Sequence, residues 1–157
     1  MRVGCGFDVH AFAAGRELIL GGVRIPHDRG LAGHSDADAL SHAICDALLG
    51  AFALGDIGAH FPDTEEKWRD ADSLLLLSET MKKVRAAGGR ILNIDATVAL
   101  QTPKLSPHIS AMRRNVAAAT GADLSQISVK ATTTEKLGFV GREEGAAVFA
   151  VAMMERT

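Results

Sequence analysis

The hydrophobic positions along the chain predict strands that take turns with helices. From 92 to 100 apolar residues alternate with mostly polar ones, and the alternation returns from 127 to 131, the period of a strand with one buried face. Over residues 36–54 apolar residues instead recur at helical spacing, at Leu40, Ala43, Ile44, Ala47 and Leu48. Strands interleaved with helices predict an α/β or α+β fold, in which helices cover a sheet.

Capping and turn residues set the expected ends of these elements. Ser35, followed three residues later by Asp38, predicts the start of the first helix, and Gly88-Gly89 predicts the end of the second. The expected helices cover residues 36–54, 71–87 and 107–119. The remaining strands are expected over residues 2–10, as a hairpin over 18–26, and over 146–154. No linker or repeat interrupts this pattern, so we expect a single domain over residues 1–157.

The last predicted strand differs from the others because it is apolar at nearly every position from Ala146 to Met154. Such a strand should be covered on both faces. Helices of the same chain can cover one face. The second face needs either another part of the chain or a second subunit, and the pattern fits both equally well.

The composition narrows the possible classes of protein. The chain has 157 residues, 47% of them hydrophobic and 23% charged, with a net charge of -2, and this balance indicates no nucleic-acid partner. Its longest apolar run, Gly145 to Met154, is much shorter than the roughly 20 residues of a membrane-spanning helix. The two cysteines, Cys5 and Cys45, form no C-x-x-C pair, and no secretory leader is recognisable, so a cytoplasmic protein is expected.

Three residues form a candidate metal site. Asp8 and His10 lie two apart in a strand, so their side chains should share one face. His42 lies on the first helix, with Asp38 and Asp46 four residues before and after it as candidate outer carboxylates. Two histidines and a carboxylate are a usual catalytic zinc set with one open position. Taken alone, the pattern also fits ordinary surface or core histidines.

Three further segments favour phosphate chemistry. Gly33-His34-Ser35-Asp36 precedes a helix, where backbone N–H groups bind anions. The loop with Gly55-Asp56-Ile57-Gly58 and Phe61-Pro62-Asp63-Thr64 offers carboxylates to substrate hydroxyls. Residues 130–136, K-A-T-T-T-E-K, supply hydroxyls, cations and a hard oxygen ligand for Mg²⁺. Each segment also fits a plain structural role, as a helix cap, a surface loop or a strand end.

In combination these motifs are specific. G-F-D-V-H, G-H-S-D, G-D-I-G, F-P-D-T and K-A-T-T-T-E-K-L-G-F occur in one order, and together they resemble the 2-C-methyl-D-erythritol 2,4-cyclodiphosphate synthase family over essentially the whole chain. The resemblance implies a homotrimer of α/β subunits, each with a mixed sheet that faces a central channel and carries helices on one side. It implies a phosphorus-oxygen lyase that converts 4-diphosphocytidyl-2-C-methyl-D-erythritol 2-phosphate to the cyclic diphosphate and CMP.

The resemblance also assigns roles to individual residues. It implies Zn²⁺ on Asp8, His10 and His42, and Mg²⁺ or Mn²⁺ on Glu135. The methylerythritol phosphate half of the substrate is expected to contact the zinc ligands Asp8 and His10, and also His34, Ser35, Asp56, Gly58, Phe61 and Asp63. The cytidine diphosphate half is expected, on a neighbouring subunit, at Leu100, Lys104, Leu105, Ser106, Ala131, Thr132 and Thr133. His34 and Thr133 are expected to act on the reacting phosphates.

Two other positions match family binding residues, Phe139 and Arg142. Arg142 is a candidate anion ligand in the central channel, where the resemblance allows an isoprenoid diphosphate. The neighbouring Glu143 departs from the common family pattern and is expected to weaken anion binding there.

Two other functions remain compatible with the residues. A zinc-dependent phosphodiesterase or phosphatase would use metal-bound water as its nucleophile and release an uncyclised phosphate. A non-catalytic trimeric binding module would need neither the open zinc set nor Glu135.

Overall fold

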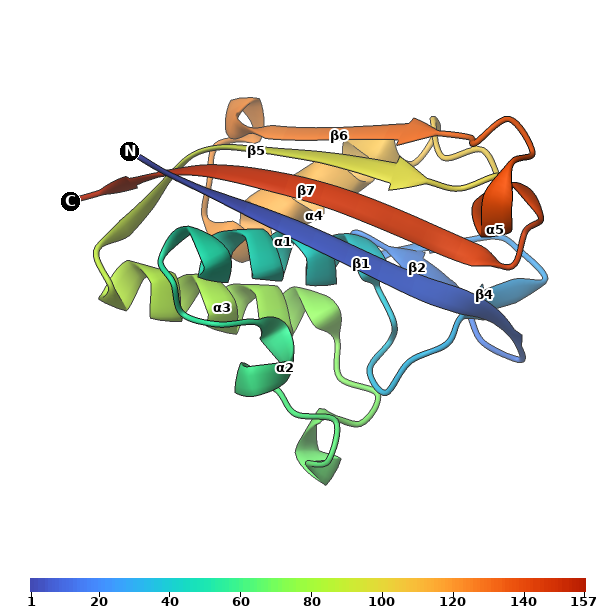
Figure 1. The fold of residues 1–157 in the computed structure, drawn as a ribbon, viewed down its shortest axis with the longest axis horizontal. Helices are drawn as coiled ribbons and strands as arrows, with labels where there is room; N and C mark the ends of the chain where they lie inside the picture. The colour runs from blue at the N-terminus through green and yellow to red at the C-terminus, as the bar shows by residue number, and fades with distance from the viewer.

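Five strands form one mixed sheet, in the order β4-β1-β7-β5-β6, in a computed structural model that describes residues 1–157. The strands are β1 (Arg2–Ala14), β4 (Arg29–Leu31), β5 (Gly89–Ala99), β6 (Ile127–Thr132) and β7 (Gly145–Arg156). All neighbours pair antiparallel except β5 and β6, which are parallel. The chain thus joins its first and last long strands, β1 and β7, side by side at the centre of the sheet (Figure 1).

Three long helices cover one face of this sheet: α1 (Ala39–Ala51), α3 (Ser73–Ala86) and α4 (Ile109–Thr120). Short elements fill the connections: the hairpin β2 (Leu18–Leu20) and β3 (Val23–Ile25), the helices α2 (Ile57–His60) and α5 (Gly138–Gly141), and the 3₁₀ turns η1 (Glu66–Trp68) and η2 (Leu124–Gln126). The predicted α/β domain, with a mixed sheet and helices on one side, is confirmed.

The core lies between the helices and the sheet. Leu40, Ile44 and Leu48 of α1 are fully buried, and they belong to one cluster of 33 buried residues that also includes Val148 and Ala150 of β7. The helical spacing in the sequence therefore identified the buried face of α1 correctly. Burying such aliphatic side chains contributes roughly 1.5–3 kcal/mol each.

The start of α1 differs from the prediction. The N-cap is Asp38, whose carboxylate accepts a hydrogen bond from the Ser41 N–H at 3.1 Å, whereas Ser35 lies outside the helix. The physical reason is the backbone of Ala37, whose φ of 57° is left-handed and cannot continue a right-handed helix. The turn before α1 therefore extends to residue 38. The other predicted helices and strands begin and end within a few residues of their expected bounds, whereas β4, α2 and α5 were not predicted.

The second face of the sheet is open in the single chain. Its apolar side chains come from the odd positions of β1 and β7, and Val3, Phe7 and Phe149 are each more than half exposed. The rings of Phe7 and Phe149 pack together with centroids 4.6 Å apart. The alternative in which the same chain covers both faces of the last strand is therefore wrong, because every long helix lies on the opposite side.

Candidate active site

Two predicted metal ligands lie on the face of β1 that is turned toward the helices. After Arg2, the even positions of this strand are the buried Gly4 and Gly6, followed by Asp8 and His10. A Cβ atom on Gly4 would lie 1.8 Å from the carbonyl oxygen of Ala47, so glycine is needed for α1 to approach this strand. The close approach brings His42, on α1, to the two β1 side chains.

Three donor atoms converge at this point. Asp8 Oδ2 lies 2.9 Å from His10 Nε2 and 3.3 Å from His42 Nδ1, and the two ring nitrogens are 3.3 Å apart. Asp8 Oδ2 is buried, yet no hydrogen bond of good geometry satisfies it. A divalent cation bound between this buried oxygen and the two ring nitrogens would give the oxygen the partner that it lacks. The prediction that these three residues form a potential metal site is confirmed.

The charges of the cluster favour a cation. Burial alone would raise the pKa of the Asp8 carboxyl, but the contacts with His10 and His42 outweigh it and hold that pKa well below its ordinary value. Burial would likewise lower the pKa of His10, but the Asp8 carboxylate outweighs it and raises that pKa. Asp8 is therefore ionised at neutral pH and contributes one negative charge to the ligand set.

The outer nitrogens of both histidines also have partners. His10 Nδ1 donates to the backbone carbonyl of Ala32 at 2.5 Å. His42 Nε2 lies 2.9 Å from the hydroxyl of Ser73 and 3.1 Å from that of Ser35. Such outer contacts fix which ring nitrogen is free to face a metal.

The predicted outer carboxylates have other roles. Asp38 accepts hydrogen bonds from the backbone N–H groups of Gly21 and Gly22, which makes it a tie between α1 and the β2–β3 hairpin. Asp46 accepts from the N–H of Ile57 at 2.7 Å and so holds the start of α2. Both residues lie four positions from His42 in the helix. Their carboxylate oxygens, however, accept hydrogen bonds from backbone N–H groups that are distant in the sequence.

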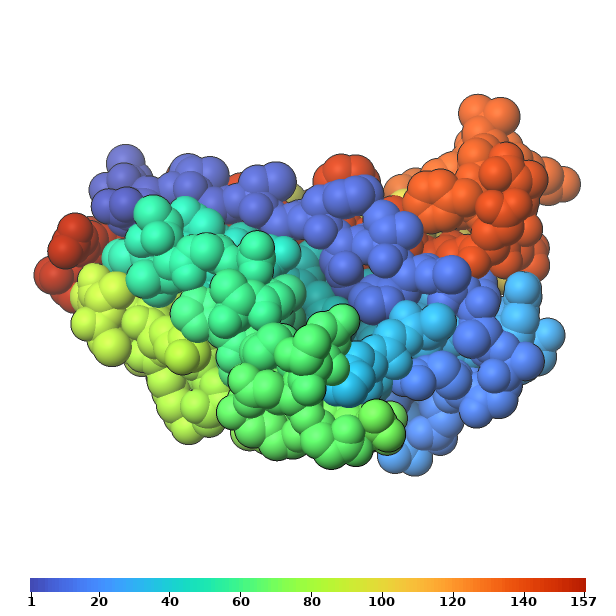
Figure 2. All heavy atoms as spheres, turned by 60° about the horizontal axis from the view of Figure 1, so that its bottom comes forward, coloured from blue at the N-terminus to red at the C-terminus, as the bar shows by residue number.

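A cavity of about 320 Å³ adjoins the cluster. Figure 2 shows the green segment from α2 to η1 lying against the light-blue turn before α1, and the cavity draws its walls from these parts of the chain. Among the predicted residues, its lining includes His10, His34, Ser35, His42, Gly58, Phe61 and Asp63. Asp56 lies at the start of α2, where its carboxylate caps the helix by accepting from Ala59 N–H at 2.8 Å.

Sequence reasoning missed one aromatic wall of this cavity. Trp68 packs edge-on against Phe61, with ring centroids 5.0 Å apart, and its buried indole N–H has no partner. The buried Nε2 of His34 is also without a partner. Unpartnered buried polar atoms beside a cavity mark places where a ligand can form hydrogen bonds. The F-P-D-T motif pointed to Phe61, but no signal in the sequence connected Trp68 with it.

The residues expected to bind cytidine line a different cavity. It measures about 230 Å³ and lies where β5 and β6 end, next to the start of α4. Its walls include Leu100, Lys104, Leu105, Ser106, Ala131, Thr132 and Thr133. The two cavities share no lining residue. A single chain therefore separates the predicted residues into two cavities.

The remaining predicted residues follow β6. Thr133 donates its hydroxyl to Glu135 at 2.8 Å, and both side chains are exposed. Glu135 is not part of the Asp8, His10 and His42 cluster. Phe139 is 38% exposed on α5.

The charge next to Arg142 is not the one that we expected. Its guanidinium contacts both carboxylate oxygens of Glu144, at 2.7 and 3.2 Å, and this pairing raises the pKa of Arg142. Glu143 instead lies by Arg29, which donates to its backbone carbonyl. The expected weakening of anion binding by Glu143 stays a prediction, but the carboxylate paired with Arg142 is that of Glu144, while the carboxylate of Glu143 lies 3.8 Å from Arg29.

The fold and the site define a class of protein, an α/β domain with a carboxylate and two histidines beside a cavity. None of its helices has the length and hydrophobicity that a membrane span requires. The YgbB family model matches residues 1–155. The chain therefore belongs to the YgbB family, the 2-C-methyl-D-erythritol 2,4-cyclodiphosphate synthases.

Individual relatives agree with this membership. The chain is 62% identical to the 2-C-methyl-D-erythritol 2,4-cyclodiphosphate synthase of Syntrophobacter fumaroxidans, over 98% of this chain and 97% of that protein. It is 60% identical to the synthase of Salinibacter ruber over 99% of both chains. Among solved structures, the bifunctional IspDF of Campylobacter jejuni superposes with a TM-score of 0.95 at 47% identity, over 99% of this chain and 42% of that longer one. A CDP-bound synthase gives a TM-score of 0.90 at 37% identity, over 98% and 100%.

Proposed function

We propose that the chain converts 4-diphosphocytidyl-2-C-methyl-D-erythritol 2-phosphate to 2-C-methyl-D-erythritol 2,4-cyclodiphosphate with release of CMP. The observation that carries this proposal is the converging set of Asp8, His10 and His42 donor atoms beside a cavity, in a full-length member of the synthase family. Such a set suits a reaction in which negatively charged phosphate groups must be brought together.

The two cavities, as half-sites, suit the two ends of this substrate. The cavity beside the metal cluster carries Ser35 and Asp63, whose oxygens can bond the hydroxyls and phosphate-bearing end of the methylerythritol group. The second cavity combines apolar walls with Lys104 and Thr133, which suits a nucleotide base, its ribose and its phosphates. One solved relative is described as bound to CDP, which supports the second assignment.

The reaction needs no nucleophile from the protein. An oxygen of the 2-phosphate forms a bond to the β-phosphorus, and the bond from that phosphorus to the bridging oxygen breaks, so that this oxygen leaves with CMP. The protein holds the two reacting phosphates in line, which removes most of the entropic barrier. His34 lines the first cavity and Thr133 the second, and in this proposal they would donate hydrogen bonds to the phosphate oxygens as charge shifts.

Divalent cations complete the charge balance. Asp8, His10 and His42 would hold Zn²⁺ and Glu135 would hold Mg²⁺ or Mn²⁺, and these ions supply the positive charge that offsets repulsion between phosphates. Asp8 and His10 then also lie next to bound substrate. Glu135 would reach the diphosphate only from the second half-site, since it is not part of the cluster.

A homotrimer would unite the half-sites. Two observations support it: each chain separates the two cavities, and the sheet exposes an apolar face formed by β1 and β7. Packing these faces around an axis would create a channel and cover both faces of the last strand. Phe139 and Arg142 precede β7 by a few residues along the chain, and an isoprenoid diphosphate is a candidate ligand for them. Such an anion would have to displace Glu144 from Arg142.

Product analysis tests the proposed reaction. Wild-type protein with Zn²⁺ and Mg²⁺ should release CMP and give the phosphorus NMR signals of a cyclic diphosphate. His42→Ala should lose bound zinc and product together while keeping its circular dichroism spectrum. A free, uncyclised phosphate would identify a zinc phosphodiesterase or phosphatase instead. Absence of turnover with both metals bound would favour a binding module.

Two unpaired cysteines support the expected cytoplasmic location.

A further inference from the structure

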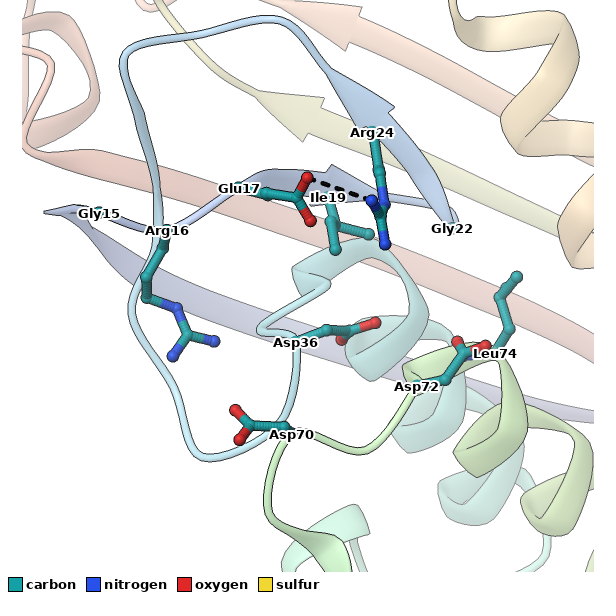
Figure 3. A pocket seen from close by; sticks show the side chains of 10 residues that line it. All are labelled: Gly15, Arg16, Glu17, Ile19, Gly22, Arg24, Asp36, Asp70, Asp72 and Leu74. Carbon is teal, nitrogen blue, oxygen red and sulfur yellow. Dashed lines mark hydrogen bonds and ion pairs between the residues drawn. The ribbon is translucent and has the colours of Figure 1, made fainter.

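Asp36 accepts hydrogen bonds from Ser73, the first residue of α3, through both of its carboxylate oxygens. One oxygen accepts the hydroxyl of Ser73 in a very short hydrogen bond, and the other accepts the Ser73 backbone N–H at 3.1 Å. Ser73 is fully buried, whereas Asp36 is half-buried. Asp36 also lines a polar cavity of about 530 Å³ that shares no residue with the metal cavity (Figure 3). Its carboxylate therefore belongs to neither half-site.

The hydrogen bonds between these residues have only one consistent direction. A carboxylate can only accept, so the Ser73 hydroxyl must donate its proton to Asp36. The Ser73 oxygen then has only lone pairs to offer His42 Nε2, 2.9 Å away, which must carry the ring proton. Ser35 Oγ also lies within reach of Nε2, at 3.1 Å, and accepts from Ala37 N–H at 3.2 Å; its second lone pair can accept from Nε2, but no contact fixes the direction of its own proton as Asp36 does for Ser73.

The consequence reaches the metal cluster. When Nε2 of His42 carries the proton, Nδ1 is left with a free lone pair, and Nδ1 is the atom that faces Asp8 and His10. If the Ser73 hydroxyl were free to turn, it could donate to Nε2 and stabilise the opposite tautomer, which cannot bind a cation through Nδ1.

We propose that Asp36 and Ser73 are positioning residues that set the tautomer of His42 and so raise the affinity of the cluster for a divalent cation. This inference rests on the proposed function in one respect, that the cluster binds a cation. Outer contacts of this kind typically change metal affinity by 10- to 100-fold. Neither residue would touch the cation or the substrate. The effect of Asp36 on the tautomer is transmitted through the Ser73 hydroxyl, whereas its bonds to the backbone N–H groups of Ser73 and Asp38 are the same for either tautomer.

The test is the zinc affinity of the metal-free protein, measured by competition with a chromophoric chelator. Ser73→Ala should bind Zn²⁺ about tenfold more weakly, because Ser35 remains as an acceptor. Asp36→Ala should lose at least as much zinc affinity, because it frees the Ser73 hydroxyl to donate to His42 Nε2. The double variant should match Ser73→Ala, since Asp36 then has no hydroxyl to act through. Thr80→Val is the matched control: Thr80 is equally buried on α3, outside this network, and should leave the affinity unchanged.

A second measurement separates positioning from a loss of folded structure. Ring ¹⁵N chemical shifts of His42 in the metal-free protein at alkaline pH should report the Nε2–H tautomer in wild type and Thr80→Val, and a growing Nδ1–H fraction in Asp36→Ala. Ser73→Thr, which keeps the hydroxyl, should recover most of the affinity. The proposal would be overturned if the loss of zinc affinity in the double variant were the product of the two single losses, or if the tautomer of His42 were unchanged in Asp36→Ala. Failure of wild type itself to bind Zn²⁺ would instead overturn the proposed function.

Discussion

Gly6 of β1 lies directly against the backbone of Ala43 in α1, and a Cβ atom on Gly6 would come within 1.9 Å of the Ala43 carbonyl oxygen. No rotamer change can relieve such a contact, because both partners are backbone or Cβ. The contact fixes how closely α1 approaches β1. His42 is the neighbour of Ala43 in sequence, so the same contact sets the distance from His42 to Asp8.

Replacing Gly6 with Ala should therefore disturb both stability and the metal site. The added methyl group must push α1 away from β1, which we expect to cost about 1–3 kcal/mol in the free energy of unfolding and to weaken zinc binding. Gly50→Ala is the matched control on α1, because its Cβ would have only Cys5 O nearby, at 3.9 Å. That variant should be as stable as wild type or slightly more so. Urea unfolding and zinc competition check both; equal behaviour of the two variants would contradict the explanation.

Asp38 should prove to be a structural residue and not part of the metal centre. Its buried carboxylate accepts hydrogen bonds from the N–H groups of Gly21, Gly22 and Ser41 and from the Ser41 hydroxyl. Asp38→Ala leaves several buried donors without partners and should lower the free energy of unfolding by roughly 2–4 kcal/mol. The protein that remains folded should retain its zinc. Elemental analysis beside chemical unfolding measures both, and loss of zinc without loss of stability would restore Asp38 as an outer carboxylate.

The exposed apolar face should control assembly. Phe149 is 53% exposed and packs against Phe7, so Phe149→Glu should place a charge in the proposed interface and yield monomers. Wild type should sediment at about three times the chain mass of 16.5 kDa. Leu75→Glu, at a 51% exposed position on α3, is the control and should not change the mass. An active wild-type monomer would refute the shared site.

Glu135 should affect turnover and leave zinc untouched. Glu135→Gln keeps the side chain's shape but removes the charge that a hard divalent cation prefers. Turnover should fall by roughly 100-fold, as for other lost electrostatic stabilisers, while the affinity for CDP falls much less. Added Mg²⁺ should restore part of the activity. Glu143→Gln is the control, because Glu143 lies beside Arg29. Unchanged turnover and magnesium dependence in Glu135→Gln would require another carboxylate in this role.

The sequence by itself determined whatever depends on neighbours along the chain. Periodicity located the strands and helices, and the two-residue spacing of Asp8 and His10 put both on one face of β1, because alternation in a strand is a local geometric rule. The ordered motifs gave the family. Local rules also misled, since the spacing of Asp38 and Asp46 around His42 said nothing about the Gly21, Gly22 and Ile57 donors that occupy their oxygens.

Only the tertiary structure decided the relationships between distant residues. Ser73 meets His42 across 31 positions and Asp36 across 37, contacts that no period along the chain encodes. The open face of β7 likewise follows from which side of the sheet the helices cover, and the two cavities are separate because different segments of the chain form their walls. The apolar pattern of β7 required that both of its faces be covered. It did not say whether the same chain or another chain covers the second face. Packing in three dimensions decides this, because a helix can cover only a limited area of the sheet.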